Sequence, residues 1–251
     1  MFNEVCDKYF NNFKSILPYI VVKTAFDLIL LKLCFFNLNI LTSKHYMFGQ
    51  NNNNLISAAN SNITMSFILY IAIAIFTEPL FGTYIRVILR KIISNEEINH
   101  RECFTEGFSY YWRFLGVTVI IALIFLAFII PTIILGLIPF IGILLLIGVI
   151  VGIVYIGTIY SPCLEYLILN NSTISDALSN GTSVGKKYFW RILLLSFVVS
   201  LVQRVETNDK ISSISIFVIL TLIYLAVDSF AALYRMSLCK EYDSPETNWQ
   251  S

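Results

Sequence analysis

Residues 108–130 read FSYYWRFLGVTVIIALIFLAFII. The segment Tyr111–Arg113, an aromatic residue followed by tryptophan and arginine, stands at its start, and no charged residue follows it until Glu165. About 20 mostly apolar residues cross a hydrocarbon layer of about 30 Å as a helix. The stretch therefore predicts a transmembrane helix that is entered through an aromatic–arginine segment.

The aromatic–arginine segment occurs twice. Residues 189–191 repeat the pattern before another apolar run, and a shift of 78 positions also aligns Gly107 with Gly185 and Tyr110 with Tyr188. Tryptophan and tyrosine favour the headgroup layer of a membrane, and arginine favours its cytoplasmic side. Six residues are therefore predicted to be interfacial anchors without a catalytic role: Tyr111, Trp112, Arg113, Phe189, Trp190 and Arg191.

The whole composition indicates a membrane protein. Of the 251 residues, 57% are hydrophobic and 13% are charged, and the mean hydropathy is +0.75. A soluble domain carries about 25% charged residues. Long apolar runs without strand-like alternation predict an all-α polytopic helix bundle rather than a barrel. Six transmembrane helices are expected at Ile16–Leu41, Ile63–Ile92, Phe114–Leu135, Pro139–Leu169, Ile192–Val205 and Ile211–Leu238.

Charge distribution predicts how the chain is oriented. With a cytoplasmic N-terminus, twelve of the seventeen lysines and arginines lie on the inner side and three on the outer side. Positive residues accumulate in cytoplasmic loops, so both termini are expected in the cytoplasm and the protein in the plasma membrane. The net charge of +1 indicates no nucleic-acid partner. The five cysteines are scattered, which argues against a disulfide framework and a zinc ribbon.

The chain is expected to form one domain, residues 1–251, built from internal repeats. Amphipathic interfacial helices are predicted before the third and fifth spans, with N-cap patterns at Ser94 and Thr173 and a break at Gly107 and at Gly185. The N-terminus resembles a third, worn copy. Parallel units of about 1–93, 94–171 and 172–240 follow, with a short polar tail at 241–251.

Charged residues within the apolar stretches form a candidate intramembrane polar cluster. Its members are Lys23, Asp27, Lys32, Glu78 and Asp228. Ionisable side chains inside a membrane are costly and suggest an ion, proton or lipid site. The alternative is structural: Lys23 extends to the inner interface, and the two acids at the inner ends of their spans pair with Arg86 or Arg235.

Small residues and proline in the fourth span predict how it packs. Gly148 and Gly152 have the spacing of closely packed membrane helices. This span has about 31 residues, more than a straight crossing requires, so it is expected to tilt, bend at Pro162 or extend into the cytoplasm.

The motifs do not indicate an enzyme. Residues 96–101 match the paired-glutamate signature of CAAX-type intramembrane proteases, which also need histidines on later helices. The chain has no histidine after His100, and no P-loop or GxSxG motif. We therefore expect no catalytic residues, no metal site and no cofactor.

Several of these segments resemble a group of uncharacterised bacterial six-helix membrane proteins. The resemblance covers residues of about 75 to 200 and rests on Glu78-Pro79, Phe108–Arg113, Ser161-Pro162, Asp176–Ser179 and Gly185–Arg191. The group includes the membrane domain fused to some glycerophosphodiester phosphodiesterases and the YciC-like proteins. The resemblance implies a six-helix membrane fold. It implies no enzymatic activity, because the soluble phosphodiesterase domain is not present.

Three functions remain open from the sequence. The first is a non-enzymatic membrane or envelope module that interacts with membrane lipid or with another membrane protein. The second is a transport component, either a small transporter or a permease subunit that works with a separate ATPase subunit. The third is an intramembrane enzyme that uses Lys23, Glu78 and Asp228.

Overall fold

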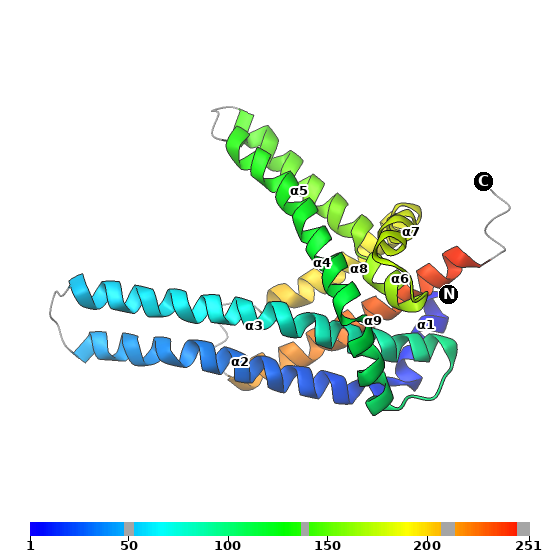
Figure 1. Cartoon of the computed structure of the whole chain (residues 1–251), viewed down its shortest axis with the longest axis horizontal. Coiled ribbons are helices and arrows are strands. Elements are labelled where there is room, and N and C mark those ends of the chain that lie inside the picture. Colours follow the sequence, from blue (N-terminus) through cyan, green and yellow to red (C-terminus); the bar gives the residue numbers. More distant parts are fainter. Residues whose placement is uncertain (48–52, 137–140, 207–213, 245–251) are drawn as a thin grey trace.

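The computed structural model consists of helices and the segments that join them (Figure 1). It describes the backbone of residues 1–47, 53–136, 141–206 and 214–244, and the side chains of residues 1–30, 68–131, 148–203 and 218–244. No strand occurs within these residues, so the all-α prediction is confirmed for them. The helices are α1 (Phe2–Asn11), α2 (Phe13–Met47), α3 (Asn53–Ser94), α4 (His100–Gly136), α5 (Ile141–Tyr160), α6 (Cys163–Leu169), α7 (Ile174–Lys187), α8 (Phe189–Glu206) and α9 (Ile214–Asp243).

Four described segments are long and apolar enough to cross a membrane. They are Ile68–Ser94, His100–Pro131, Gly148–Leu169 and Val218–Asp243, and they overlap the second, third, fourth and sixth predicted spans. The shorter apolar helix Phe189–Gln203 overlaps the fifth. The first predicted span falls on α2. The side chains of α2 beyond residue 30, including that of Lys32, lie outside the described residues.

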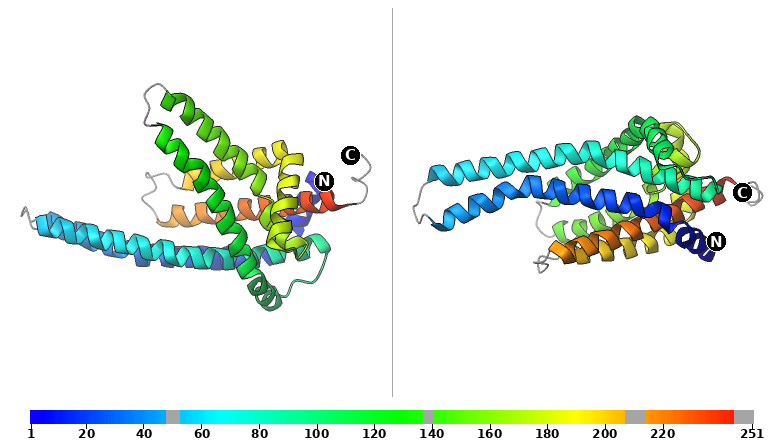
Figure 2. Two further views of the ribbon diagram at one scale, coloured as in Figure 1. Left: turned by 45° about the horizontal axis from the view of Figure 1, so that its top comes forward. Right: turned by 90° about the horizontal axis from the view of Figure 1, so that it is seen from below.

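The long helices are arranged as hairpins. Consecutive helices pack as the pairs α2–α3, α4–α5 and α8–α9. These hairpins diverge from one common end of the molecule (Figures 1 and 2). Large apolar side chains along them are exposed, among them Ile75, Leu123, Val151 and Leu194. Lipid tails are as apolar as leucine, so a hydrocarbon solvent accommodates this exposure.

The common end is a packed core, here called the base. It comprises α1, the start of α2, the end of α3 from about residue 80, α4 up to about residue 117, α6, α7 and the last half of α9. Buried apolar side chains gather there, including Ile88, Leu89, Leu167, Ile168 and Leu233. At its centre α3, α6 and α9 all contact one another.

Three further helical segments surround this centre. The first part of α4 packs on α3, α7 packs on α5 and α6, and α1 packs on α9. The first part of α4 and α7 each lie against the end of the hairpin that precedes them in the chain. Helix α1 lies against the last hairpin, so the three segments follow a cyclic order. The first helix of the chain, α1, therefore packs against its last helix, α9.

Two predicted helix boundaries before the third span are wrong. Ser94 ends α3 instead of capping a new helix, and the Asn99 side chain accepts a hydrogen bond from the Arg101 backbone N–H at 3.1 Å at the start of α4. The helix also continues through Gly107 without a break. A Cβ at Gly107 would lie 3.2 Å from Tyr84 Cα, so this glycine permits close helix contact rather than a turn.

Two local predictions in the second half of the chain are confirmed. The Thr173 side chain caps α7 by accepting a hydrogen bond from the Asp176 backbone N–H at 3.2 Å. The predicted bend at Pro162 is also present, because α5 ends at Tyr160 and α6 begins at Cys163. Proline cannot donate the hydrogen bond that a continuous helix would need there.

Candidate functional site

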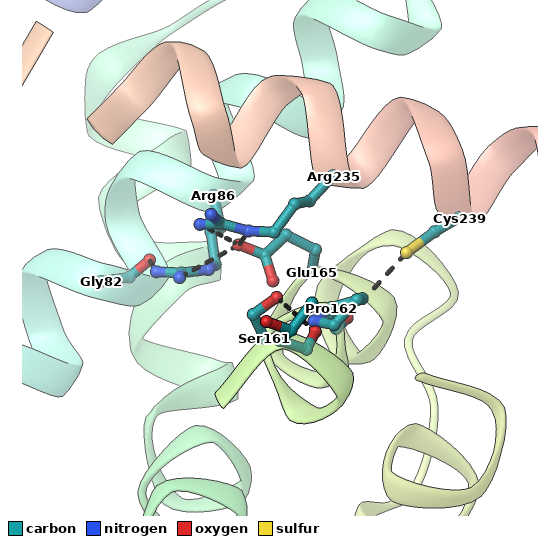
Figure 3. A network of polar contacts seen from close by, with 8 residues as sticks. Gly82, Arg86, Ser161, Pro162, Glu165, Arg235 and Cys239 are labelled. Carbon is teal, nitrogen blue, oxygen red and sulfur yellow. Dashed lines mark hydrogen bonds and ion pairs between the residues drawn. The ribbon is translucent and has the colours of Figure 1, made fainter. Parts of the chain in front are cut away.

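A buried carboxylate lies at the centre of the base (Figure 3). The Glu165 side chain is 0% exposed, and its Oε1 is 3.2 Å from Arg86 Nη2 and 3.0 Å from Arg235 Nη2. Arg235 Nε also donates a hydrogen bond to this oxygen at 3.0 Å. We call Arg86, Glu165 and Arg235 the central ion cluster.

Each member of the central ion cluster comes from a different helix of the centre, α3, α6 or α9. Arg86 Nη1 also donates to the Gly82 carbonyl at 3.2 Å, and its guanidinium lies 5.1 Å from the Phe114 ring centroid. Glu165 Oε2 and Arg86 Nε are buried without a hydrogen-bond partner among the described residues. The contacts fix the helices relative to one another, since a buried charge is costly once its partner is lost.

Sequence reasoning missed Glu165. A signal was present, because Glu165 is the only charged residue between Arg113 and Asp176. A lone acid within a long apolar stretch requires a cationic partner. What the sequence lacked was any local partner: both arginines are more than 65 residues away along the chain.

The structure brings together three of the five residues of the predicted polar cluster. Lys23 Nζ lies 2.6 Å from Asp27 Oδ1 and 2.6 Å from Glu78 Oε1. The side chains differ in exposure, because Lys23 is 7% exposed and Glu78 is 59% exposed. We call Lys23, Asp27 and Glu78 the peripheral ion cluster. It joins α2 to α3.

Asp228 lies apart from these ion pairs. Within the described part of the chain it forms no salt bridge, although its negative charge acts on Arg235. Burial raises the pKa of Tyr9, and the charge of Asp228 raises it further. Asp228 therefore lies near α1 and the central ion cluster.

The two aromatic–arginine segments have the same internal geometry. The ring centroids of Tyr111 and Trp112 are 5.2 Å apart with an interplanar angle of 83°, and those of Phe189 and Trp190 are 5.4 Å apart at 83°. Trp112 is 70% exposed and Trp190 is 77% exposed. Tyr111, in contrast, is buried.

The two arginines of these segments also correspond. Arg113 lies 4.8 Å from the Tyr110 ring centroid, and Arg191 lies 5.5 Å from that of Tyr188. Arg113 has a second role, because its Nη1 donates to the Ser172 carbonyl at 3.2 Å. It thereby holds the turn between α6 and α7.

Two tyrosine hydroxyls make hydrogen bonds that show how far along their helices Glu78 and Asp228 lie. The Tyr111 hydroxyl donates to the Phe76 carbonyl at 3.1 Å, and the Tyr9 hydroxyl donates to the Ala226 carbonyl at 2.7 Å. Glu78 and Asp228 each follow two residues after such a contact, a rise of about 3 Å along a helix. Glu78 therefore lies level with Tyr111, and Asp228 lies level with Tyr9, both at the edge of the base.

Glycines permit several of the closest helix contacts. A Cβ at Gly152 would meet the Phe128 ring, whereas one at Gly148 would have nothing within 4 Å. Within the part of the chain whose side chains are described, Gly152 therefore makes a close contact and Gly148 does not. A Cβ at Gly185 would lie 2.7 Å from Ile159 Cα, so Gly185 contacts a backbone as Gly107 does.

One open polar hollow lies between the end of α3 and the start of α4. It has a volume of about 700 Å³ and is lined in part by Lys91, Arg101, Glu102 and Glu106. Lys91 Nζ and Glu102 Oε2 are 3.7 Å apart within it. Over the described residues no group of three or more histidine, cysteine or acidic side chains could hold a metal ion.

Comparison with known proteins leaves the family open. No family model, no curated protein and no solved structure matches the chain. The features of the molecule that bear on function are the two ion clusters, the aromatic–arginine segments and the division between base and hairpins.

Proposed function

We propose that the chain is a non-enzymatic membrane module with six transmembrane helices, in which the base lies at the cytoplasmic face and binds lipid or a partner protein. The observation that carries this proposal is the division of the molecule. Apolar side chains are buried in the base, whereas those of the hairpins are exposed. The proposal includes membership of the uncharacterised six-helix group that the sequence resembles.

The distribution of charge supports the cytoplasmic location of the base. Its described helices contain basic residues that include Arg90, Lys91, Lys186, Lys187 and Lys240. Positive residues near the ends of spans favour the cytoplasmic side. The two exposed tryptophans then lie where the base meets the inner leaflet, as interfacial aromatic residues do.

Matched contacts support an origin from repeats. The two aromatic pairs, the two arginine–tyrosine contacts and the glycines Gly107 and Gly185 each correspond at the offset of 78 residues. In α1, Tyr9 and Phe10 form a third edge-to-face pair at 5.8 Å and 81°. We infer three parallel units in cyclic order around the central ion cluster, to which each contributes one residue.

The first part of α4 supports an interfacial helix. Cys103, Gly107 and Tyr110 face α3 and are buried. Phe104 and Phe108 lie on a second side and are exposed, with Trp112 one turn further on. Glu102 and Glu106 lie on a third side, toward the polar hollow. A helix with buried, aromatic and polar sides suits the boundary between protein, lipid and water.

Cysteine accessibility in intact cells tests the proposed orientation. In a cysteine-free background, we expect Asn52→Cys to react with a membrane-impermeant thiol reagent and Ser179→Cys, on the exposed side of α7, to react only after permeabilisation. Cys103 is unsuitable as a probe because it is buried whatever the orientation. Labelling of Ser179→Cys in intact cells would contradict the proposal.

A permease subunit is the second candidate, and one observation favours it. Residues of α7 that correspond to Phe104 and Phe108 at the offset of 78 are Thr182 and Lys186. This side of α7 is therefore polar, as a surface that docks a soluble ATPase would be. Cross-linking from Ser179→Cys to an ATPase, dependent on nucleotide, would establish this function, and its absence favours the module.

A further inference from the structure

Glu78 is the most exposed charged side chain of the peripheral ion cluster, and it lies at the edge of the base. Its side chain is 59% exposed while its Lys23 partner is 7% exposed. Among the described residues Glu78 forms no other ion pair than that with Lys23, through Oε1. It lies two residues beyond the contact of Tyr111 with Phe76, and thus level with Tyr111.

An apolar stripe leads away from Glu78 along α3. Ile75, Ile71 and Ile68 precede it by three, seven and ten residues and are 53%, 40% and 55% exposed. Residues at these spacings share one face of a helix. The surface therefore presents a carboxylate at the edge of the base and a stripe that runs toward the far end of the hairpin.

We propose that this surface binds a membrane lipid with an ammonium headgroup, the ammonium against the Glu78 carboxylate and an acyl chain along the isoleucine stripe. The inference rests on the proposed membrane function, which supplies the lipid and places Glu78 at headgroup depth. A carboxylate that accepts a hydrogen bond from an ammonium group makes a charge-assisted contact, stronger than one between neutral groups.

The charges at the site favour a cationic group over an anionic one. Lys23 carries the only positive charge of the peripheral ion cluster, and it is enclosed between Asp27 Oδ1 and Glu78 Oε1. An approaching phosphate would therefore meet carboxylates before it reached the ammonium of Lys23. Like charges in contact are unfavourable, most of all where water is scarce.

Glu102 provides a matched control. Like Glu78, it is an exposed glutamate, 67% exposed, that pairs with a mostly buried lysine. It lies in the polar hollow and not beside the isoleucine stripe. Replacing it removes the same charge from the protein without changing the proposed lipid surface.

Native mass spectrometry of the delipidated full chain in detergent tests the proposal, with phosphatidylethanolamine and phosphatidylglycerol as probes. We expect the unaltered chain to retain phosphatidylethanolamine about tenfold more tightly, the difference that one charge-assisted contact provides. Glu78→Gln should abolish this preference, Glu102→Gln should preserve it, and Glu78→Asp should keep most of it.

Two results would overturn the inference: equal retention of both lipids by the unaltered chain, or a preference that survives in Glu78→Gln. Displacement of the lipid by free ethanolamine at equal concentration would also contradict it, because the stripe would then contribute nothing. Failure of the membrane proposal itself would appear differently, as a chain that is absent from the membrane fraction before any lipid is added.

Discussion

The base and the hairpins use the same apolar residue types in opposite ways. Leu233 in the base is 0% exposed, whereas Leu123 in the hairpin of α4 and α5 is 57% exposed. The base resembles the interior of a soluble domain, with side chains from several helices in contact. The hairpins bury little of their surface, so lipid must complete it. The difference teaches that the helices are positioned by the base and solvated by the membrane.

The two ion clusters follow the same division. In the central ion cluster the carboxylate of Glu165 is fully enclosed by two arginines. In the peripheral ion cluster Glu78 is mainly exposed. Charges deep in the base therefore hold helices together, and a charge at the edge of the base is accessible to a ligand.

Removing the carboxylate of the central ion cluster is expected to have the largest effect on stability. Glu165→Leu leaves the charges of Arg86 and Arg235 buried without an anion, which costs about 3–5 kcal/mol. Unfolding in detergent, followed by circular dichroism, measures this loss. The triple variant Arg86→Met, Glu165→Leu and Arg235→Met should recover most of the stability, because no buried charge remains. A single variant as stable as the unaltered chain would contradict the assignment.

A pair of leucine substitutions compares the two regions directly. Leu233→Ala should destabilise the protein by about 2–5 kcal/mol, because it opens a cavity in the base. Leu123→Ala removes the same atoms from an exposed position and should change the free energy of unfolding by less than about 0.5 kcal/mol. Equal effects at both sites would show that the hairpin also packs against protein.

Glycine substitutions test the close approach of helices. Gly185→Ala places a methyl group against the Ile159 backbone and should cost about 1–3 kcal/mol. Gly148→Ala is the control, since its Cβ would meet no described atom within 4 Å. A midpoint of thermal unfolding that falls for Gly148→Ala and not for Gly185→Ala would reverse the assignment of packing glycines.

Loss of a single hydrogen bond at the edge of the base should have the smallest effect. Tyr111→Phe removes the hydrogen bond to Phe76 and should cost about 1 kcal/mol. Tyr155→Phe is the matched control, because Tyr155 makes a ring contact with Phe189 that this change preserves. The difference between the two variants in a denaturant titration isolates the hydrogen bond.

The local features of the fold could be predicted from sequence. Helix type, the cap at Thr173 and the bend at Pro162 depend on nearby residues and on the apolar runs. The ion pair of Lys23 with Asp27 is also local, because residues four apart share one face of a helix. These are interactions within a few turns of chain.

The features that could not be predicted depend on contacts between distant segments. Ser94 and Gly107 have the local chemistry of a helix start and a helix break, yet packing of α4 on α3 places them otherwise. The role of Glu165 depends on two arginines from other helices. Hydropathy also could not show where α3 leaves the lipid, since a protein core and a membrane favour the same residues.

The reaction rates of the cysteines in the base can report how fast the base opens. Cys103, Cys163 and Cys239 are buried with free thiols, whereas Cys6 on α1 is partly exposed. The Cys163 and Cys239 thiols lie 3.9 Å from the Leu178 and Pro162 carbonyl oxygens, inside the same core. A thiol reagent should modify Cys6 at once and reach the other three only as fast as the base opens. Their alkylation rate thus measures how often the base comes apart while the hairpins stay in the membrane.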